Sequence, residues 1–166
     1  MTQQDWNLYM SSLASAHKMI GHSSTECHFF RGELDEFFDG FRSKVNYPAL
    51  IMESTLLDIN ADRPNRQQLR TIAFMVADNV RRDDHDDIDA AKARCESIAT
   101  DIVGKMIYDT EHLQNFAGCA VLDVHGEPLI NEPSHYVGWR MELVMREGMT
   151  ACYNKTRWIQ NEGDNN

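Results

Sequence analysis

The sequence predicts an α+β fold, in which a largely antiparallel sheet with a long β-hairpin carries one main amphipathic helix and N-terminal helices. Apolar residues recur every three or four positions over residues 86–109, as on one face of a helix. Residues 49–59 and 68–78 are rich in apolar and β-branched side chains and flank a polar segment. Residues 137–145 show the two-residue period of a strand. Because the strands follow one another in pairs, we expect an antiparallel sheet with its helices on one face.

The length and composition predict one globular domain of 166 residues. We divide it into an N-terminal helical segment (1–45), a sheet-plus-helix core (46–159) and a frayed polar tail (160–166). A formal net charge of −10 repels a phosphate backbone, so sequence-specific binding to nucleic acid is not expected. The chain contains no run of 18 apolar residues and no secretion signal, so we expect an intracellular protein without a membrane partner.

The N-terminal segment contains two predicted helices. In residues 5–20 the apolar residues recur at spacings of four and three until Gly21 ends the pattern. A second helix is predicted over about residues 32–43, with phenylalanines on one side and acids on the other. The stretch 27–30 before it fits either a short strand or the start of this helix.

The predicted hairpin begins after Pro48, which pushes its predecessor into extended geometry. Its strands, 49–59 and 68–78, are joined by a polar turn segment at residues 60–66. This loop can project beyond the body of the domain.

The C-terminal third is predicted to be mostly strand. Residues 119–125 alternate, Gly126 is expected to make a turn, and residues 128–130 resume an extended path. The strand 137–145 follows, and residues 152–159 are candidates for a last strand.

No recognisable catalytic constellation occurs in the sequence, and we expect no cofactor, no metal and no catalytic residue. The four cysteines are widely spaced and are expected to be reduced thiols; they are Cys27, Cys95, Cys119 and Cys152. Two alternatives stay open. Cys119 follows a glycine at a strand start, as a thiol nucleophile could. The histidines at 17, 22 and 28, together with Cys27, could hold zinc, although ordinary helix and loop histidines are the favoured interpretation.

Charge pattern supplies the candidate binding residues. The hairpin segment carries arginines in an otherwise acidic chain, and an acidic run precedes the main helix, where one aspartate can serve as N-cap. Arginines docking on the acidic run of an identical neighbour would make a head-to-tail contact that can close a ring. The subunit-contact candidates are Arg63, Arg66, Arg70, Asp83, Asp84, Asp86 and Asp87. A metal site in the acidic run is disfavoured, because consecutive side chains point in different directions.

The layout resembles that of the tail-completion, tail-terminator and neck proteins of tailed bacteriophages. Over residues 30–150 the resemblance consists of Tyr47–Leu50 opening a long hairpin, a single amphipathic helix, and the closing strand Tyr136–Glu142. It implies a non-enzymatic virion component, assembled in the host cytoplasm. Such a protein forms a homo-oligomeric ring with neighbouring virion proteins at the head–tail junction or the tail end.

Two other functions compete with this hypothesis. A soluble accessory protein that binds one partner would present a lone exposed apolar patch. A small enzyme would have a cleft between sheet and helix, with clustered histidines and carboxylates of shifted pKa.

Overall fold

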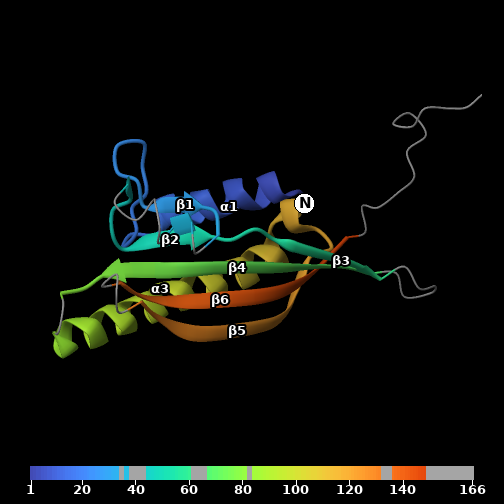
Figure 1. Cartoon of the computed structure of the whole chain (residues 1–166). Helices are drawn as coiled ribbons and strands as arrows, with labels where there is room; N and C mark the ends of the chain where they lie inside the picture. The colour runs from blue at the N-terminus through green and yellow to red at the C-terminus, as the bar shows by residue number, and fades with distance from the viewer. Residues whose placement is uncertain (34–35, 38–43, 61–66, 82–83, 132–135, 149–166) are drawn as a thin grey trace, which may run out of the picture.

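The computed structural model describes residues 1–33, 36–37, 44–60, 67–81, 84–131 and 136–148 (Figure 1). The elements are α1 (Gln3–Ala16), β1 (Phe29–Arg31), β2 (Ala49–Met52), β3 (Leu56–Asn60), β4 (Gln67–Asn79), α3 (His85–His112), the 3-10 turn η3 (Gln114–Phe116), β5 (Ala120–Asn131) and β6 (Tyr136–Glu147). Five strands lie in the order β1-β2-β4-β6-β5, and β3 pairs with β4 beyond the end of β2. Every strand pair is antiparallel except β1 with β2, so the predicted α+β fold with a largely antiparallel sheet is confirmed.

Helix α1 begins with a capping box, in which the side chains of Thr2 and Asp5 each accept a hydrogen bond from the other residue's backbone N–H. Its apolar stripe is buried as predicted, but the helix ends at Ala16 rather than at residue 20. His17 is already extended, and Gly21 has a φ of 66°, which favours glycine. The chain therefore turns away from the helix axis one turn earlier than the apolar pattern indicates.

Helix α3 is the predicted amphipathic helix, and it extends three residues beyond the predicted C-terminal end. Asp84 is the N-cap and accepts a hydrogen bond from the backbone N–H of Asp87. The buried face of the helix includes Cys95, Ile98 and Ile102. This face packs on the sheet, as its single apolar stripe predicts.

The first hairpin is present, but its outer strand is interrupted. The structure divides the predicted strand 49–59 into β2 and β3, because Thr55 leaves the ladder and donates two hydrogen bonds to Oε1 of Gln3 in α1. Both strands pair antiparallel with β4, but the register shifts by one residue between them, from Met52 opposite Phe74 to Leu56 opposite Thr71. The hairpin loop lies outside the described residues.

The second hairpin corrects the prediction of a turn at Gly126. Strand β5 runs without a break through this glycine and pairs with β6 along nearly its whole length. A Cβ atom at Gly126 would lie 2.8 Å from Sδ of Met141 and 2.9 Å from Nε1 of Trp139. The glycine therefore allows two large side chains of β6 to lie over the strand, which is a packing role rather than a turn. The strand expected at 152–159 and the polar tail lie outside the described residues.

Segment 27–30, for which two interpretations were open, contributes the short parallel strand β1. Most of the predicted second helix, 32–43, lies outside the described residues. Within it, Phe37 is fully buried and belongs to a small cluster with Ile51 and Met75. This cluster lies on the sheet face opposite to α1 and α3, because Ile51 and Met75 alternate with the residues of the main core.

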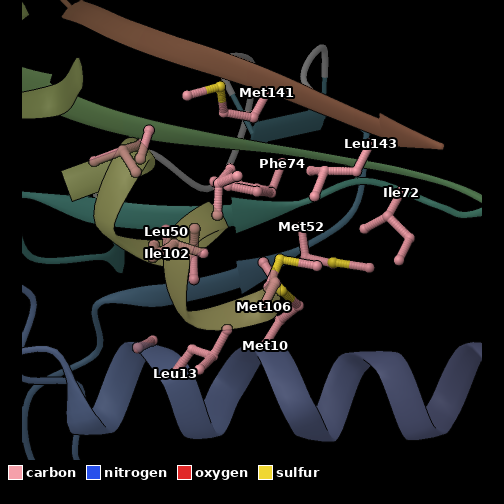
Figure 2. Packing of buried hydrophobic residues seen from close by; sticks show 14 of the residues in the cluster. Met10, Leu13, Leu50, Met52, Ile72, Phe74, Ile102, Met106, Met141 and Leu143 are labelled. Carbon is pink, nitrogen blue, oxygen red and sulfur yellow. The ribbon is translucent and has the colours of Figure 1, made fainter. Parts of the chain in front are cut away.

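The main core lies between one face of the sheet and the two helices (Figure 2). Met10 and Leu13 from α1 approach Ile102 and Met106 from α3, and strands β2, β4 and β6 supply the sheet side of this core. A polar contact also ties the helices together, since the hydroxyl of Tyr9 donates to Oδ2 of Asp109 at 2.8 Å. Burial, helped by this bond and by the charge of Asp109, raises the pKa of Tyr9. α1 and α3 are thus fixed on one face as predicted, whereas Phe37 of the predicted second helix packs on the other face.

Two glycines give a matched prediction about packing. A Cβ at Gly138 in β6 would lie 2.8 Å from the backbone oxygen of Val76, whereas a Cβ at Gly104 in α3 meets nothing within 4 Å. We expect Gly138→Ala to destabilise the fold by about 1–3 kcal/mol through overpacking. Gly104→Ala should stabilise the fold by about 0.5–1 kcal/mol, because alanine loses less backbone conformational entropy than glycine when the helix forms. Urea unfolding of both variants checks this, and equal effects of the same sign would contradict the packing at Gly138.

Candidate interaction surfaces

Arg70 does not lie on a subunit surface, which corrects its prediction as a contact residue. It is buried, and its Nε donates to Oε1 of Glu147 at 2.8 Å. Its two terminal nitrogens donate to Oγ1 of Thr55 and to the backbone oxygen of Met1, each at 2.8 Å. The guanidinium therefore joins the start of α1, the β2–β3 connection and the end of β6 inside one subunit.

Glu147 is the centre of this internal network. Trp6 Nε1 donates to its Oε1 at 2.9 Å, and Gln68 Nε2 donates to its Oε2 at 2.7 Å. Burial alone would raise the pKa of this carboxyl, but hydrogen bonds from Arg70, Trp6 and Gln68 and the charge of Arg70 hold it below its ordinary value. A carboxylate that is satisfied in this way is part of the fold and is unavailable to a ligand.

The acidic run before α3 is partly neutralised within the subunit. Arg81 Nη2 lies 3.0 Å from Oδ2 of Asp84, and the backbone N–H of Arg81 donates to Oδ2 of Asp87 at 2.8 Å. That backbone bond is the main reason why the pKa of Asp87 is lowered. The side chain of Asp86 is exposed. Of the predicted contact residues, Arg63, Arg66 and Asp83 lie outside the described residues.

The end of β3 and the start of α3, which flank the hairpin loop and the acidic run in the sequence, lie far apart in one subunit. The loop connects β3 to the first residue of β4, and α3 begins shortly after the last residue of β4. The 13 residues of β4 separate them by roughly 40 Å at the usual rise of a strand. Figure 1 shows the end of β3 and the start of α3 at opposite ends of the sheet. A contact between these two ends therefore requires two subunits.

The histidines considered as zinc ligands have other contacts. His17 Nε2 lies 3.5 Å from Oδ2 of Asp101, His22 Nδ1 accepts from the backbone N–H of His28, and His28 Nδ1 lies 2.9 Å from the oxygen of Pro48. Among the residues that the structure describes, no three His, Cys, Asp or Glu side chains are placed to share a metal ion.

The cysteine considered as a nucleophile has an unfavourable environment for a thiolate. Burial, together with the charge of Glu147, raises the pKa of Cys119. His125 follows six residues later along the same extended segment, so it lies roughly 20 Å away. The buried Cys95 has its pKa raised to about 12, first by burial and then by the charge of Asp78. Neither thiol is activated in this structure.

An apolar edge lies at the exposed strand β3. All five residues of β3 are exposed, and they include Leu56 (65%), Leu57 (47%) and Ile59 (44%). Leu57 and Ile59 lie opposite Arg70 and Gln68, so they project from the same sheet face as α1 and α3. Leu57 and Ile59 form an apolar patch on this face, and Leu56 projects from the other face; we call the strand with these three side chains the β3 edge (Leu56–Ile59).

A second apolar surface lies on the opposite edge of the sheet. A groove of about 360 Å³ runs between the last turns of α3 and the first half of β5. Its apolar walls come from Ile107, Val121, Leu122 and Val124, and two acids, Glu111 and Asp123, flank it. We call it the α3–β5 groove. None of the described lining residues is a histidine, so the groove lacks the His–carboxylate cluster expected of an enzyme cleft.

Neither surface is located by the sequence alone, although the sequence contains a signal for one of them. Leu56, Leu57 and Ile59 place apolar side chains on both faces of a strand beside a polar loop. Such a pattern indicates burial on both faces, and a strand at the edge of one subunit can achieve this through a neighbour. No sequence signal marks the groove, because two segments must meet to form it.

Of the helices that the structure describes, neither combines the length and apolar character needed to cross a membrane. No protein-family model matches this sequence, and no curated protein matches it either.

Proposed function

We propose that this chain is a non-enzymatic structural protein that assembles with copies of itself and with neighbouring proteins into a ring. The particle to which we assign it is a phage or phage-like particle, at the head–tail junction or the tail end. The layout of hairpin, helix and closing strand that resembles phage neck and tail-completion proteins supports that assignment.

The observation that carries the proposal is the pair of apolar surfaces on the two edges of one sheet. The β3 edge and the α3–β5 groove consist of different residues and lie on opposite sides of β4 and β6. A contact between two different patches is heterologous, and repetition of such a contact around an axis closes a ring. Isologous dimers, by contrast, use the same patch twice.

The charge pattern predicts a second heterologous contact, which is end to end along the strands rather than edge to edge across the sheet. In the sequence Arg63 and Arg66 stand between β3 and β4, and the acidic run with Asp83 and Asp86 follows β4, whose two ends are roughly 40 Å apart. Opposite charges at opposite ends attract neighbouring copies in one orientation and disfavour the reverse. In this proposal Arg70, Asp84 and Asp87 serve the fold of the subunit instead.

The test is the native mass of the purified chain by light scattering over a range of concentrations, with negative-stain images of the same samples. We expect a species whose mass is a multiple of 19.1 kDa and whose images show closed rings. Arg63→Glu/Arg66→Glu should reduce assembly, and more so at low ionic strength, where surface charges act over longer distances. A monomer at every concentration would contradict self-assembly.

A second function is favoured by the α3–β5 groove itself. An apolar groove beside a free strand edge is a known way of binding an extended segment of another protein. An accessory protein that binds one partner would use this groove and would remain monomeric. The mass measurement separates the two functions.

A further inference from the structure

We propose that β3 of one subunit pairs with the free edge of β5 in the next subunit, so that the sheet continues across the subunit boundary and Leu57 and Ile59 fill the α3–β5 groove. This inference rests on the proposed self-assembly and specifies the contact that produces it.

Both partner edges are available in the described structure. Strand β5 is last in the sheet order and pairs with β6 alone, and β3 pairs with β4 alone. Each strand therefore presents one row of backbone N–H and C=O groups that no described strand covers. A second strand satisfies such a row by adding itself to the sheet.

The side chains match on the face that carries the helices. On β3 this face presents Leu57 and Ile59. On β5 it presents Val121 and Val124, because the irregularity between Val121 and Asp123 shifts the alternation by one residue. In a continued sheet the four aliphatic side chains become neighbours, and the groove wall formed by Ile107 of α3 covers them. Exposed apolar surface on both edges is thereby removed from water.

The direction of pairing follows from the sheet and from ring symmetry. Within one subunit β3 is antiparallel to β4, β4 to β6 and β6 to β5, so β3 and β5 run in opposite directions. Rotation about an axis that lies along the strands leaves their direction unchanged. In a closed ring of this kind, β3 of one copy is therefore antiparallel to β5 of the next.

Charge complementarity identifies a second copy as the occupant of the groove. Glu111 and Asp123 make the groove acidic. Residues 61–66, which follow β3 in the sequence, contain two arginines and one aspartate in a chain whose net charge is −10. Antiparallel addition of β3 directs the chain that leaves it toward the start of β5, where Glu111 lies. An apolar strand followed by a basic segment thus meets an apolar groove with acidic flanks.

The first experiment compares two double variants by light scattering. Leu57→Lys/Ile59→Lys places charges on the β3 edge. Leu8→Lys/Met19→Lys adds the same charge at side chains that are at least as exposed but belong neither to β3 nor to the lining of the α3–β5 groove. We expect the β3-edge variant to need about tenfold or more higher concentration to assemble, and the control to assemble like the original chain. Circular dichroism and a thermal melt establish that both variants are folded.

The second experiment measures strand direction by disulfide formation. Chains of two sizes, each with one introduced cysteine, are mixed in a background where Cys27, Cys119 and Cys152 are serine and the fully buried Cys95 is kept. Antiparallel pairing predicts mixed disulfides for Leu57→Cys with Val124→Cys and for Ile59→Cys with Val121→Cys. The exchanged combinations, Leu57→Cys with Val121→Cys and Ile59→Cys with Val124→Cys, should give little product.

The outcomes separate this inference from the proposed function. Loss of assembly in the β3-edge variant alone, together with the antiparallel disulfides, supports the inference. If both variants still assemble, or if the exchanged combinations form disulfides, the proposed strand pairing is wrong. The proposal that the chain forms a ring is not affected by that result. A chain that is monomeric at every concentration overturns both.

Discussion

Replacement of Arg70 by methionine is expected to destabilise the subunit by about 3–5 kcal/mol at neutral pH. Methionine keeps much of the packing volume but removes the guanidinium from the buried carboxylate of Glu147, which is left with the more distant N-terminal ammonium of Met1, 3.7 Å from its Oε2. Removing one member of a buried ion pair costs this much because the remaining charge stays out of water. Thr55 and the backbone oxygen of Met1 also lose a donor. Urea denaturation followed by circular dichroism measures the change.

The double variant Arg70→Met/Glu147→Gln is the matched control. The glutamine is uncharged and can still accept a hydrogen bond from Trp6, so no buried carboxylate is left without its guanidinium. We expect it to recover at least about half of the lost stability. If the single and double variants are equally unstable, the loss comes from the network's geometry and not from the charge of Glu147.

The same pair has a predicted pH dependence. In the original chain the pKa of Glu147 is lowered from 4.5. The stability it contributes is therefore fully present above about pH 4.5 and is lost as the pH falls through the lowered value. In Arg70→Met burial becomes dominant and raises this pKa, so protonation relieves the buried charge. The stability difference between the two proteins should shrink as the pH is lowered from 7 to 4.

The second large effect is expected for Phe74→Ala, at about 3–5 kcal/mol. Phe74 is fully buried at the centre of the main core, and its cross-strand neighbours on β2 and β6 are Met52 and Met141 (Figure 2). Truncation of a core phenylalanine removes apolar contacts and leaves a cavity. Because methionine side chains adapt to irregular space, we place the value near the lower end of this range.

Phe74→Leu and Leu8→Ala are the controls for this prediction. Phe74→Leu leaves a smaller void and should cost about 1–2 kcal/mol. Leu8 is 65% exposed on α1, so Leu8→Ala should change stability by less than about 0.5 kcal/mol. Thermal and urea unfolding of all three variants gives the order. A cost for Phe74→Ala no greater than that of Leu8→Ala would contradict the central position of Phe74.

The sequence predicted those parts of the fold in which one local pattern decides the structure. The stripe on α3 and the period-two pattern of β6 are read over many residues, and both elements form as expected. The predictions are wrong where a contact with a residue distant in the sequence determines the local structure. Gly126 lies within a strand because side chains of β6 need its space, and β2 ends before β3 because Thr55 bonds to Gln3. A local pattern contains no information about such partners.

The predicted contact residues show the same limit. Arg70 is a charged residue close to a polar loop, which is typical of a surface position. The alternation of side chains along β4 nevertheless places it on the same buried face as Ile72. Charge count alone cannot distinguish an arginine that meets a neighbour from one that meets Glu147, which lies 77 positions away. The groove between α3 and β5 is likewise a product of tertiary structure, because neither segment is unusual by itself.

The central position of β4 has a consequence for how the chain is made. Residues 72–78 are buried on both faces, and the strand that covers one side of β4 is β6, which is synthesised after α3, η3 and β5. Nascent chains emerge from the ribosome in sequence order, so β4 leaves it with that side unpaired. Pairing between segments far apart in sequence is also slow. Each subunit is therefore most exposed to proteases, chaperones and aggregation before β6 is complete.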